Sequence, residues 1–233
     1  MDFTHTDDSQ PAVDYLAKTI LEHLEQEQRV LLLLAGGSNI GIAVELGKQL
    51  AGHDLGKLSI SLNDERHVPI GHADSNWHQL AEAGFDAPGA TLLPILDGKD
   101  LAATASDYNQ LLHQAYAHND YKIALFGIGP DGHIAGLLPG SPALDASDDM
   151  YATGYSDDEI KVDSGEGVKR GVARLTMTPA AISHLDEAVC FAMGDSKLPV
   201  IQELQTSIET SQLPAALLKN LPKVTIFSDQ IQS

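Results

Sequence analysis

Short apolar runs alternate with longer amphipathic stretches along most of the chain. The runs are typical of buried strands, and we expect strands over 30–34, 58–62, 121–126, 188–193 and 224–227. Apolar residues at helical spacing predict helices over 9–28, from the turn at 36–38 to 50, after 74–76, over 100–118, from 178, and over 196–204. The acidic stretch 145–170 predicts a loop. Strands separated by helices predict an α/β fold with a mainly parallel sheet covered on both faces, and we interpret 1–233 as a single domain.

Three polar or glycine-rich segments each follow a predicted strand: 36–39, 64–67 and 127–133. Ligands of such sheets bind outside the carboxyl ends of the strands. We therefore expect one cleft to gather all three segments.

The first segment, Gly36-Gly37-Ser38-Asn39, lies between a strand and a helix. Backbone N–H groups, a hydroxyl and a helix N-terminus suit a phosphate, although a plain tight turn explains the same residues. No Gly-Lys-Ser/Thr follows, so this is not a P-loop. Ile40 stands where a serine-hydrolase elbow needs glycine, which excludes that motif.

The third segment contains Gly127, Gly129 and Gly132 in the Gly-x-Gly-x-x-Gly spacing of dinucleotide-binding loops. Two of its residues argue against that function, because Pro130 lacks an N–H donor and Asp131 would aim a carboxylate at the pyrophosphate. Asp131 and His133 instead flank a glycine, an arrangement in which a carboxylate orients an imidazole and favours its protonation. This pattern is typical of a general base, although nine other histidines lie scattered along the chain.

The net charge of the chain limits the kinds of molecule it can bind. The formal net charge is -19, which disfavours nucleic acid and anionic membranes, and makes the few arginines informative for an anionic substrate. Arg66, at the end of a predicted strand, suits bidentate phosphate binding, but a solvated charge run explains it equally well.

Two pairs of histidines, His67 with His72 and His113 with His118, are spaced five residues apart, and this spacing does not favour a metal site. The acidic N-terminus does not resemble a secretory signal, and we expect a cytoplasmic protein without membrane contact.

Taken in order, six segments of the chain resemble the 6-phosphogluconolactonase family. They are Gly36-Gly37-Ser38, Asp64-Glu65-Arg66-His67-Val68-Pro69, Asp74-Ser75-Asn76, Gly129-Pro130-Asp131-Gly132-His133, Leu138-Pro139-Gly140 and Arg174-Leu175-Thr176-Met177-Thr178.

The resemblance implies a three-layer α/β/α, Rossmann-like fold and a carboxylic ester hydrolase that converts 6-phosphogluconolactone to 6-phosphogluconate in the oxidative pentose phosphate pathway. It implies no cofactor and no metal, and a small sugar-phosphate lactone as the partner of a monomer or small homo-oligomer. His133 would activate water and Asp131 would position His133. Arg66 and Arg174 would handle phosphate or oxyanion charge, while Gly37, Ser38 and Asn39 would cradle the phosphate with Lys197 adding a cation.

Two departures from the family pattern keep alternatives open. Asn39-Ile40 replaces the family's Thr-Pro, which questions phosphate affinity, and Ile134 to Leu138 lack two hydroxyls and an aromatic ring near His133. A glucosamine-6-phosphate deaminase-like isomerase is one alternative, but the deaminases' acid is replaced by Leu138. A non-catalytic phosphosugar-binding protein is the other.

Overall fold

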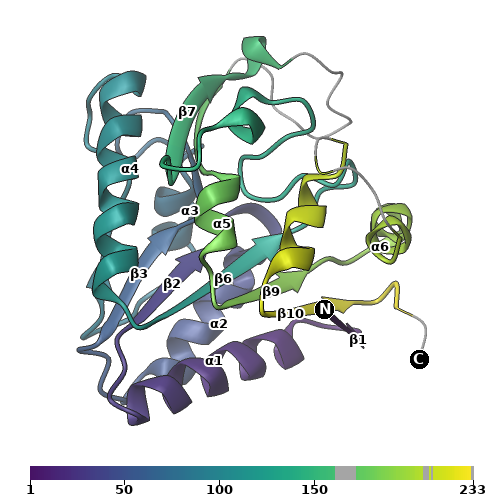
Figure 1. The fold of residues 1–233 in the computed structure, drawn as a ribbon. Coiled ribbons are helices and arrows are strands. Elements are labelled where there is room, and N and C mark those ends of the chain that lie inside the picture. Colours follow the sequence, from purple (N-terminus) through teal and green to yellow (C-terminus); the bar gives the residue numbers. More distant parts are fainter. Residues whose placement is uncertain (161–171, 207–209, 211, 232–233) are drawn as a thin grey trace.

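The computed structural model describes residues 1–160, 172–206, 210 and 212–231. Its centre is a seven-stranded, wholly parallel sheet in the order β1-β10-β9-β6-β2-β3-β5 (Figure 1). The strands are β1 Asp2–His5, β2 Val30–Leu34, β3 Leu58–Leu62, β5 Thr91–Leu92, β6 Tyr121–Gly127, β9 Glu187–Phe191 and β10 Lys223–Ser228. The predicted mainly parallel sheet is confirmed.

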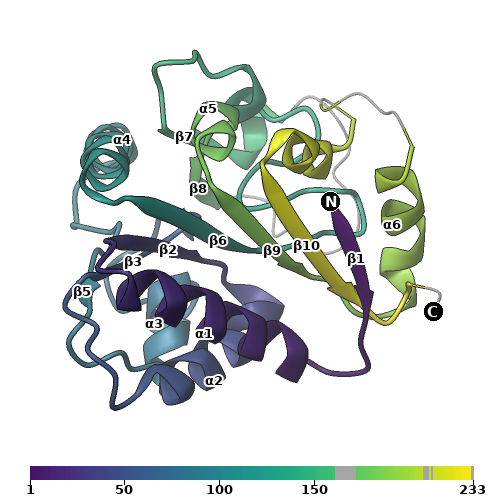
Figure 2. The same ribbon diagram turned by 60° about the horizontal axis from the view of Figure 1, so that its bottom comes forward.

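Helices cover both faces of this sheet, and Figure 2 shows the three layers from the side of α1 and α2. The helices are α1 Gln10–Glu25, α2 Ile40–Leu50, α3 Asn76–Glu82, α4 Leu101–His118, α5 Pro179–Ser183 and α6 Leu198–Leu204. α1, α2 and α3 lie on one face, and α4 and α5 lie on the other. All five residues of β2 are inaccessible to solvent, as expected for a central strand between two helical layers. The predicted α/β/α fold is confirmed.

A second sheet was not predicted. It is antiparallel, with β4 Asp64–Arg66, β8 Ala173–Met177 and β7 Ala152–Ser156 in the order β4-β8-β7. The prediction of a loop over 145–170 is therefore wrong for β7, while 161–171 lie outside the described residues. The charged strand β4 lacks the apolar alternation by which strands are found.

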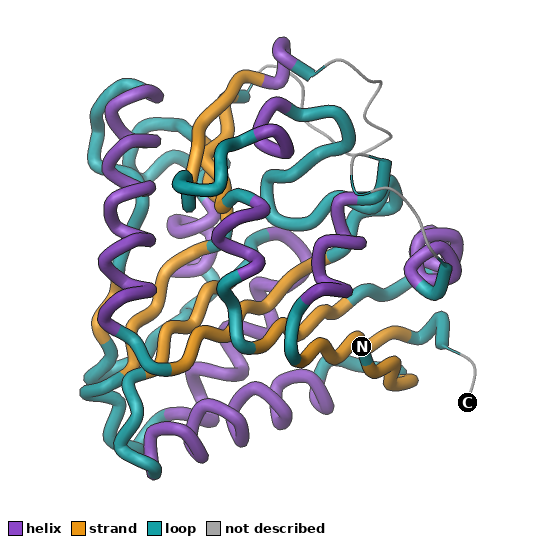
Figure 3. Tube along the Cα trace, in the orientation of Figure 1, coloured by secondary structure: helices purple, strands orange, loops and turns teal. Residues whose placement is uncertain are grey.

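Three of the helices drawn in purple in Figure 3 begin at predicted positions whose side chains accept hydrogen bonds from free N–H groups of the first turn. Ser75, Asp100 and Thr178 each accept such a bond, at the starts of α3, α4 and α5. β1 escaped prediction because its residues are mostly exposed and polar, and its pairing with β10 is a long-range contact. Within the described residues, no helix is long and apolar enough to cross a membrane. The single-domain interpretation stays a prediction.

Candidate active site

A cavity of about 230 Å³ opens at the carboxyl ends of β2 and β6. Gly36, Gly37 and Ser38 line it after β2, and Ile128, Gly129, Pro130 and His133 line it after β6. The small sheet adds Asp64 and Arg66 from β4. The three segments expected to share a cleft do so.

Asp131 does not itself line the cavity, but its carboxylate is hydrogen-bonded to the imidazole of His133, which does. Asp131 Oδ1 lies 2.6 Å from His133 Nδ1 and accepts a second hydrogen bond, of 3.2 Å, from the His133 backbone N–H. The turn is closed by Gly129 N–H, which donates to the His133 carbonyl at 2.8 Å. A Cβ on Gly129 would lie 2.1 Å from His133 Nδ1, so only glycine lets the two side chains fold over this backbone.

The state of this pair follows from its contacts. Burial alone would raise the pKa of Asp131, but the hydrogen bond and the charge of His133 outweigh it and lower that pKa. An ionised carboxylate only accepts hydrogen bonds, so His133 Nδ1 carries the proton. In a neutral imidazole this tautomer leaves the lone pair of Nε2 free, and His133 lines the cavity, which suits it to accept a proton there.

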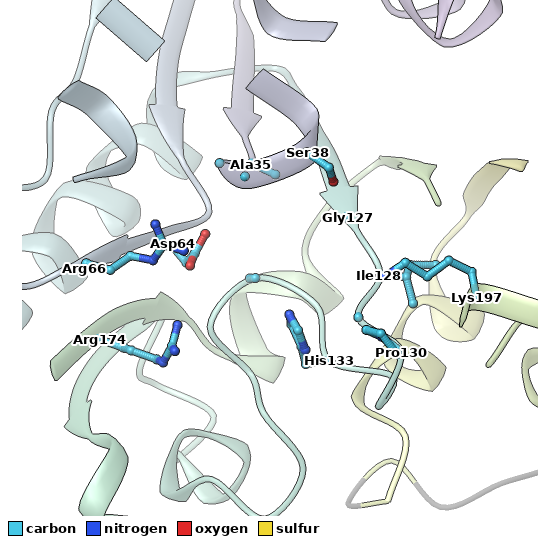
Figure 4. A pocket seen from close by; sticks show the side chains of 14 residues that line it. Ala35, Ser38, Asp64, Arg66, Gly127, Ile128, Pro130, His133, Arg174 and Lys197 are labelled. Carbon is cyan, nitrogen blue, oxygen red and sulfur yellow. The ribbon is translucent and has the colours of Figure 1, made fainter. Parts of the chain in front are cut away.

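Arg66 and Arg174 share one face of the small sheet. They are paired residues of the antiparallel strands β4 and β8, and both line the cavity. Asp64 lies two residues before Arg66 and therefore on the same face of β4. Figure 4 shows Asp64 and the two arginines on one side of the cavity and Lys197 on the other, with His133 between them.

Asp64 was missed as a site residue by the sequence reasoning. Asp64 is only 8% exposed. Burial raises the pKa of its carboxyl group despite the opposing charges of Arg66, Arg174 and His133. The only sequence signal was its place at the end of a strand, and in the charge run Asp64-Glu65-Arg66 that signal does not distinguish it from Glu65. Glu65 is fully buried and does not line the cavity.

Of the three residues predicted to cradle a phosphate in the loop after β2, Gly37 and Ser38 line the cavity. Gly37 has a φ of +62°, a left-handed conformation suited to glycine, and Ser38 lines the cavity at the start of α2. Asn39, the third, is fully buried and does not line the cavity. Its amide lies against Gly127, and neither Oδ1 nor Nδ2 has a hydrogen-bond partner among the described residues.

Lys197 lines the cavity, as predicted. Burial lowers its pKa, and the negative charge of Asp131 acts in the opposite direction. His67, the other histidine next to a candidate segment, lies outside the cavity lining, with its Nε2 3.0 Å from the Lys99 carbonyl. Within the described ranges, no group of three His, Cys, Asp or Glu side chains could hold a metal ion.

The departures after His133 fall mainly in the core. Ile134, Leu137 and Leu138 are buried, and only Ala135 of that segment reaches the cavity, with a φ of +49°. Position 138, where the deaminase alternative would require an acid, is therefore occupied by an apolar side chain that packs away from solvent.

The fold and the cavity together define an α/β enzyme with a polar, cation-lined cleft for a small anionic substrate. The chain belongs to the family of glucosamine-6-phosphate isomerases and 6-phosphogluconolactonases, whose family model matches residues 5–226. The predicted kinship with the 6-phosphogluconolactonases, which are carboxylic ester hydrolases, is thereby confirmed.

Its relatives include both activities of the family. A 6-phosphogluconolactonase of Xylella fastidiosa is 30% identical over 91% of this chain and 86% of its own. A glucosamine-6-phosphate deaminase of Streptococcus thermophilus is 28% identical over 85% of this chain and 88% of its own. The solved structure of a 6-phosphogluconolactonase from Shewanella baltica covers 98% of this chain and 97% of its own, with a TM-score of 0.77 at 19% identity, which establishes the fold alone.

Proposed function

We propose that this chain hydrolyses 6-phosphogluconolactone to 6-phosphogluconate, a step of the oxidative pentose phosphate pathway. The observation that supports this most directly is the Asp131–His133 pair, joined at 2.6 Å in a cavity lined by Arg66, Arg174 and Lys197. Such a cavity pairs a proton acceptor with cations for a phosphorylated substrate. The relatives named 6-phosphogluconolactonase support the same substrate.

In this reaction His133 is the general base. Nε2 takes a proton from water as the water oxygen bonds to the lactone carbonyl carbon, and the carbonyl oxygen becomes an oxyanion. Collapse of that intermediate breaks the ring C–O bond, and the departing sugar oxygen takes the proton back from His133. The Asp131 carboxylate stabilises the imidazolium between the two steps.

The remaining cavity residues divide between the phosphate and the carbonyl. Gly37 and Ser38 precede α2, where backbone N–H groups and a hydroxyl favour an anion, and Lys197 supplies a cation. Arg66 and Arg174 neutralise the phosphate or the developing oxyanion. The reaction needs no cofactor or metal, and we expect a cytoplasmic monomer or small homo-oligomer.

Deamination of glucosamine 6-phosphate is the second candidate, favoured by the relative from Streptococcus thermophilus. The buried Leu138 argues against it, because no carboxyl group stands at that position to work with His133. A phosphosugar-binding protein without catalysis is the third candidate, and only turnover excludes it.

The test follows freshly prepared 6-phosphogluconolactone at fixed pH, with the spontaneous hydrolysis subtracted. We expect turnover that survives a chelator, and a fall in kcat of about 10²–10⁴-fold in His133→Ala. His67→Ala is the matched control, because His67 lies outside the cavity lining, and it is expected to keep parental kcat. Ammonia release from glucosamine 6-phosphate would establish the second candidate. Tight binding of 6-phosphogluconate without turnover would establish the third.

A further inference from the structure

A buried carboxylate fixes the first turn of α3 on strand β4. Glu65 Oε1 accepts hydrogen bonds from the backbone N–H groups of Arg66 at 2.7 Å and Asn76 at 2.6 Å. Its Oε2 accepts from Trp77 N–H at 3.0 Å and from the Ser75 hydroxyl at 2.9 Å. Glu65 is fully buried, so this strand and this helix start are tied together inside the protein.

The helix start held in this way presents Asn76 to two charged groups of the cavity. Asn76 Oδ1 accepts a hydrogen bond of 2.6 Å from Arg66 Nη1. Asn76 Nδ2 donates to the Asp64 carbonyl at 3.0 Å and to the Asp64 carboxylate at 3.3 Å. One amide thus offers its acceptor to the guanidinium and its donor to the carboxylate.

The same amide also packs beneath the loop after β2. A Cβ added to Gly36 would lie 2.1 Å from Asn76 Oδ1, so the backbone of this loop rests directly on the Asn76 side chain. Asn76 is 1% exposed and does not line the cavity. It nevertheless contacts Gly36, Asp64 and Arg66, which do line it.

We propose that Asn76 is a positioning residue, which aims the Arg66 guanidinium and the Asp64 carboxylate into the cavity without touching the substrate. An amide is suited to this because it has one acceptor atom and one donor atom at the same distance from the backbone. Aspartate would keep the acceptor for Arg66 but turn a second oxygen toward the Asp64 carboxylate. Alanine would remove both contacts and leave Arg66 Nη1 with the Asp74 carbonyl, 3.2 Å away.

The proposal rests on the proposed lactonase function for its catalytic readout, and a double-mutant cycle tests it. In the parent, Asn76→Ala is expected to raise KM about 10-fold with a smaller effect on kcat, because a hydrogen bond to a charged group is lost. In an Arg66→Ala background, Asn76→Ala should change KM less than 2-fold, since its effect on binding passes through Arg66. Asn76→Asp keeps the acceptor for Arg66 but loses the donor to Asp64, so it should reverse part of the KM increase seen in Asn76→Ala.

Ser75→Ala is the matched control. Ser75 belongs to the same helix start and bonds to Glu65 and to His78 N–H, but no hydrogen bond of its side chain reaches Arg66 or Asp64. Its KM should stay parental even if its melting temperature falls. Should Asn76→Ala fail to fold, Asn76→Ser takes its place in the cycle.

Three results would overturn the proposal: equal KM increases with and without Arg66, the same KM increase in Ser75→Ala, or no recovery in a folded Asn76→Asp. A parent protein without lactonase turnover contradicts the proposed function and leaves this inference open to a separate measurement. Calorimetric titration with inorganic phosphate then replaces KM by Kd in the same cycle, with the same expected pattern and the same three contradicting results.

Discussion

Arg66 and Arg174 are directly paired across β4 and β8, so two guanidinium groups lie on the same face of the small sheet and line the same cavity. Like charges in such a pair repel one another, and the Asp64 carboxylate in the same cavity offsets part of that repulsion. In a chain of net charge -19 this pair is a local reversal of sign. In the proposed function, the anionic substrate would bring its negative charge next to both guanidinium groups, which favours binding.

Replacing either arginine should therefore weaken binding of the phosphorylated substrate. We expect Arg66→Ala and Arg174→Ala each to lower kcat/KM about 10-fold or more at low salt, the usual effect of losing a charged hydrogen bond. Arg29→Ala is the control, because it changes the net charge equally but precedes β2, at the end of the strand away from the cavity. Parental kcat/KM in both cavity variants would show that neither arginine contacts the substrate.

The carboxylate of Asp131 is expected to matter for chemistry rather than binding. Asp131→Asn keeps a similar shape but removes the charge that stabilises the His133 imidazolium, and it permits the wrong tautomer. We expect kcat to fall about 100-fold or more, with KM changed less than 3-fold. Steady-state kinetics on the folded variant check this, and a kcat within 3-fold of the parent would assign the proton transfer to another group.

Asn39 and Ser38 should behave in opposite ways. Asn39 is fully buried and its amide has no partner among the described residues, a state that typically costs about 1–3 kcal/mol. Asn39→Leu is therefore expected to stabilise the fold by about 1 kcal/mol without changing KM, since leucine has a similar size and needs no partner. Ser38→Ala removes a hydroxyl from the cavity wall and should raise KM several-fold.

Denaturant unfolding and KM measurements separate these two effects. A large increase of KM in Asn39→Leu would mean that the amide reaches the substrate after all, by a rearrangement of the loop after β2. Such a result would restore Asn39 to the phosphate cradle predicted from the sequence.

The parts of the site that the sequence predicted are those set by local geometry. Asp131 and His133 flank one glycine, so their contact follows from two residues of spacing and a turn. The main sheet was predictable because β2, β6 and β9 are buried on both faces and are therefore apolar.

The parts that escaped prediction depend on long-range pairing. β4 consists of Asp64, Glu65 and Arg66, and it forms a strand because Glu65 finds three donors at the start of α3 and Arg66 pairs with Arg174. Nothing in the local charge pattern distinguishes such a strand from a solvated turn. For the same reason the cavity carboxylate of Asp64 could not be separated from the structural carboxylate of Glu65.

Asp64 and Asp131 line or border one cavity with pKa values shifted in opposite directions, and this predicts opposite pH dependences of stability. Burial raises the pKa of Asp64, so the folded state binds its proton more tightly than the unfolded state does. The stability this group contributes is present at low pH and is lost as the pH rises from the ordinary value of 3.8 through the raised one. The pKa of Asp131 is lowered, so its contribution is present above 3.8 and is lost as the pH falls through the lowered value.

Replacing Asp64 or Asp131 by asparagine removes the titrating carboxyl group at that position. The two variants therefore form a matched pair. Asp64→Asn should be more stable than the parent at neutral pH, with the advantage shrinking as the pH falls toward 3.8, while its catalytic activity drops. Asp131→Asn should be less stable than the parent at neutral pH, with the deficit disappearing in acid. Urea unfolding of the three proteins between pH 3 and pH 8 measures both differences, and charges elsewhere in the chain cancel in each comparison. Differences that do not change with pH, or that change in the same direction for both variants, would contradict the opposite electrostatic environments of the two carboxylates.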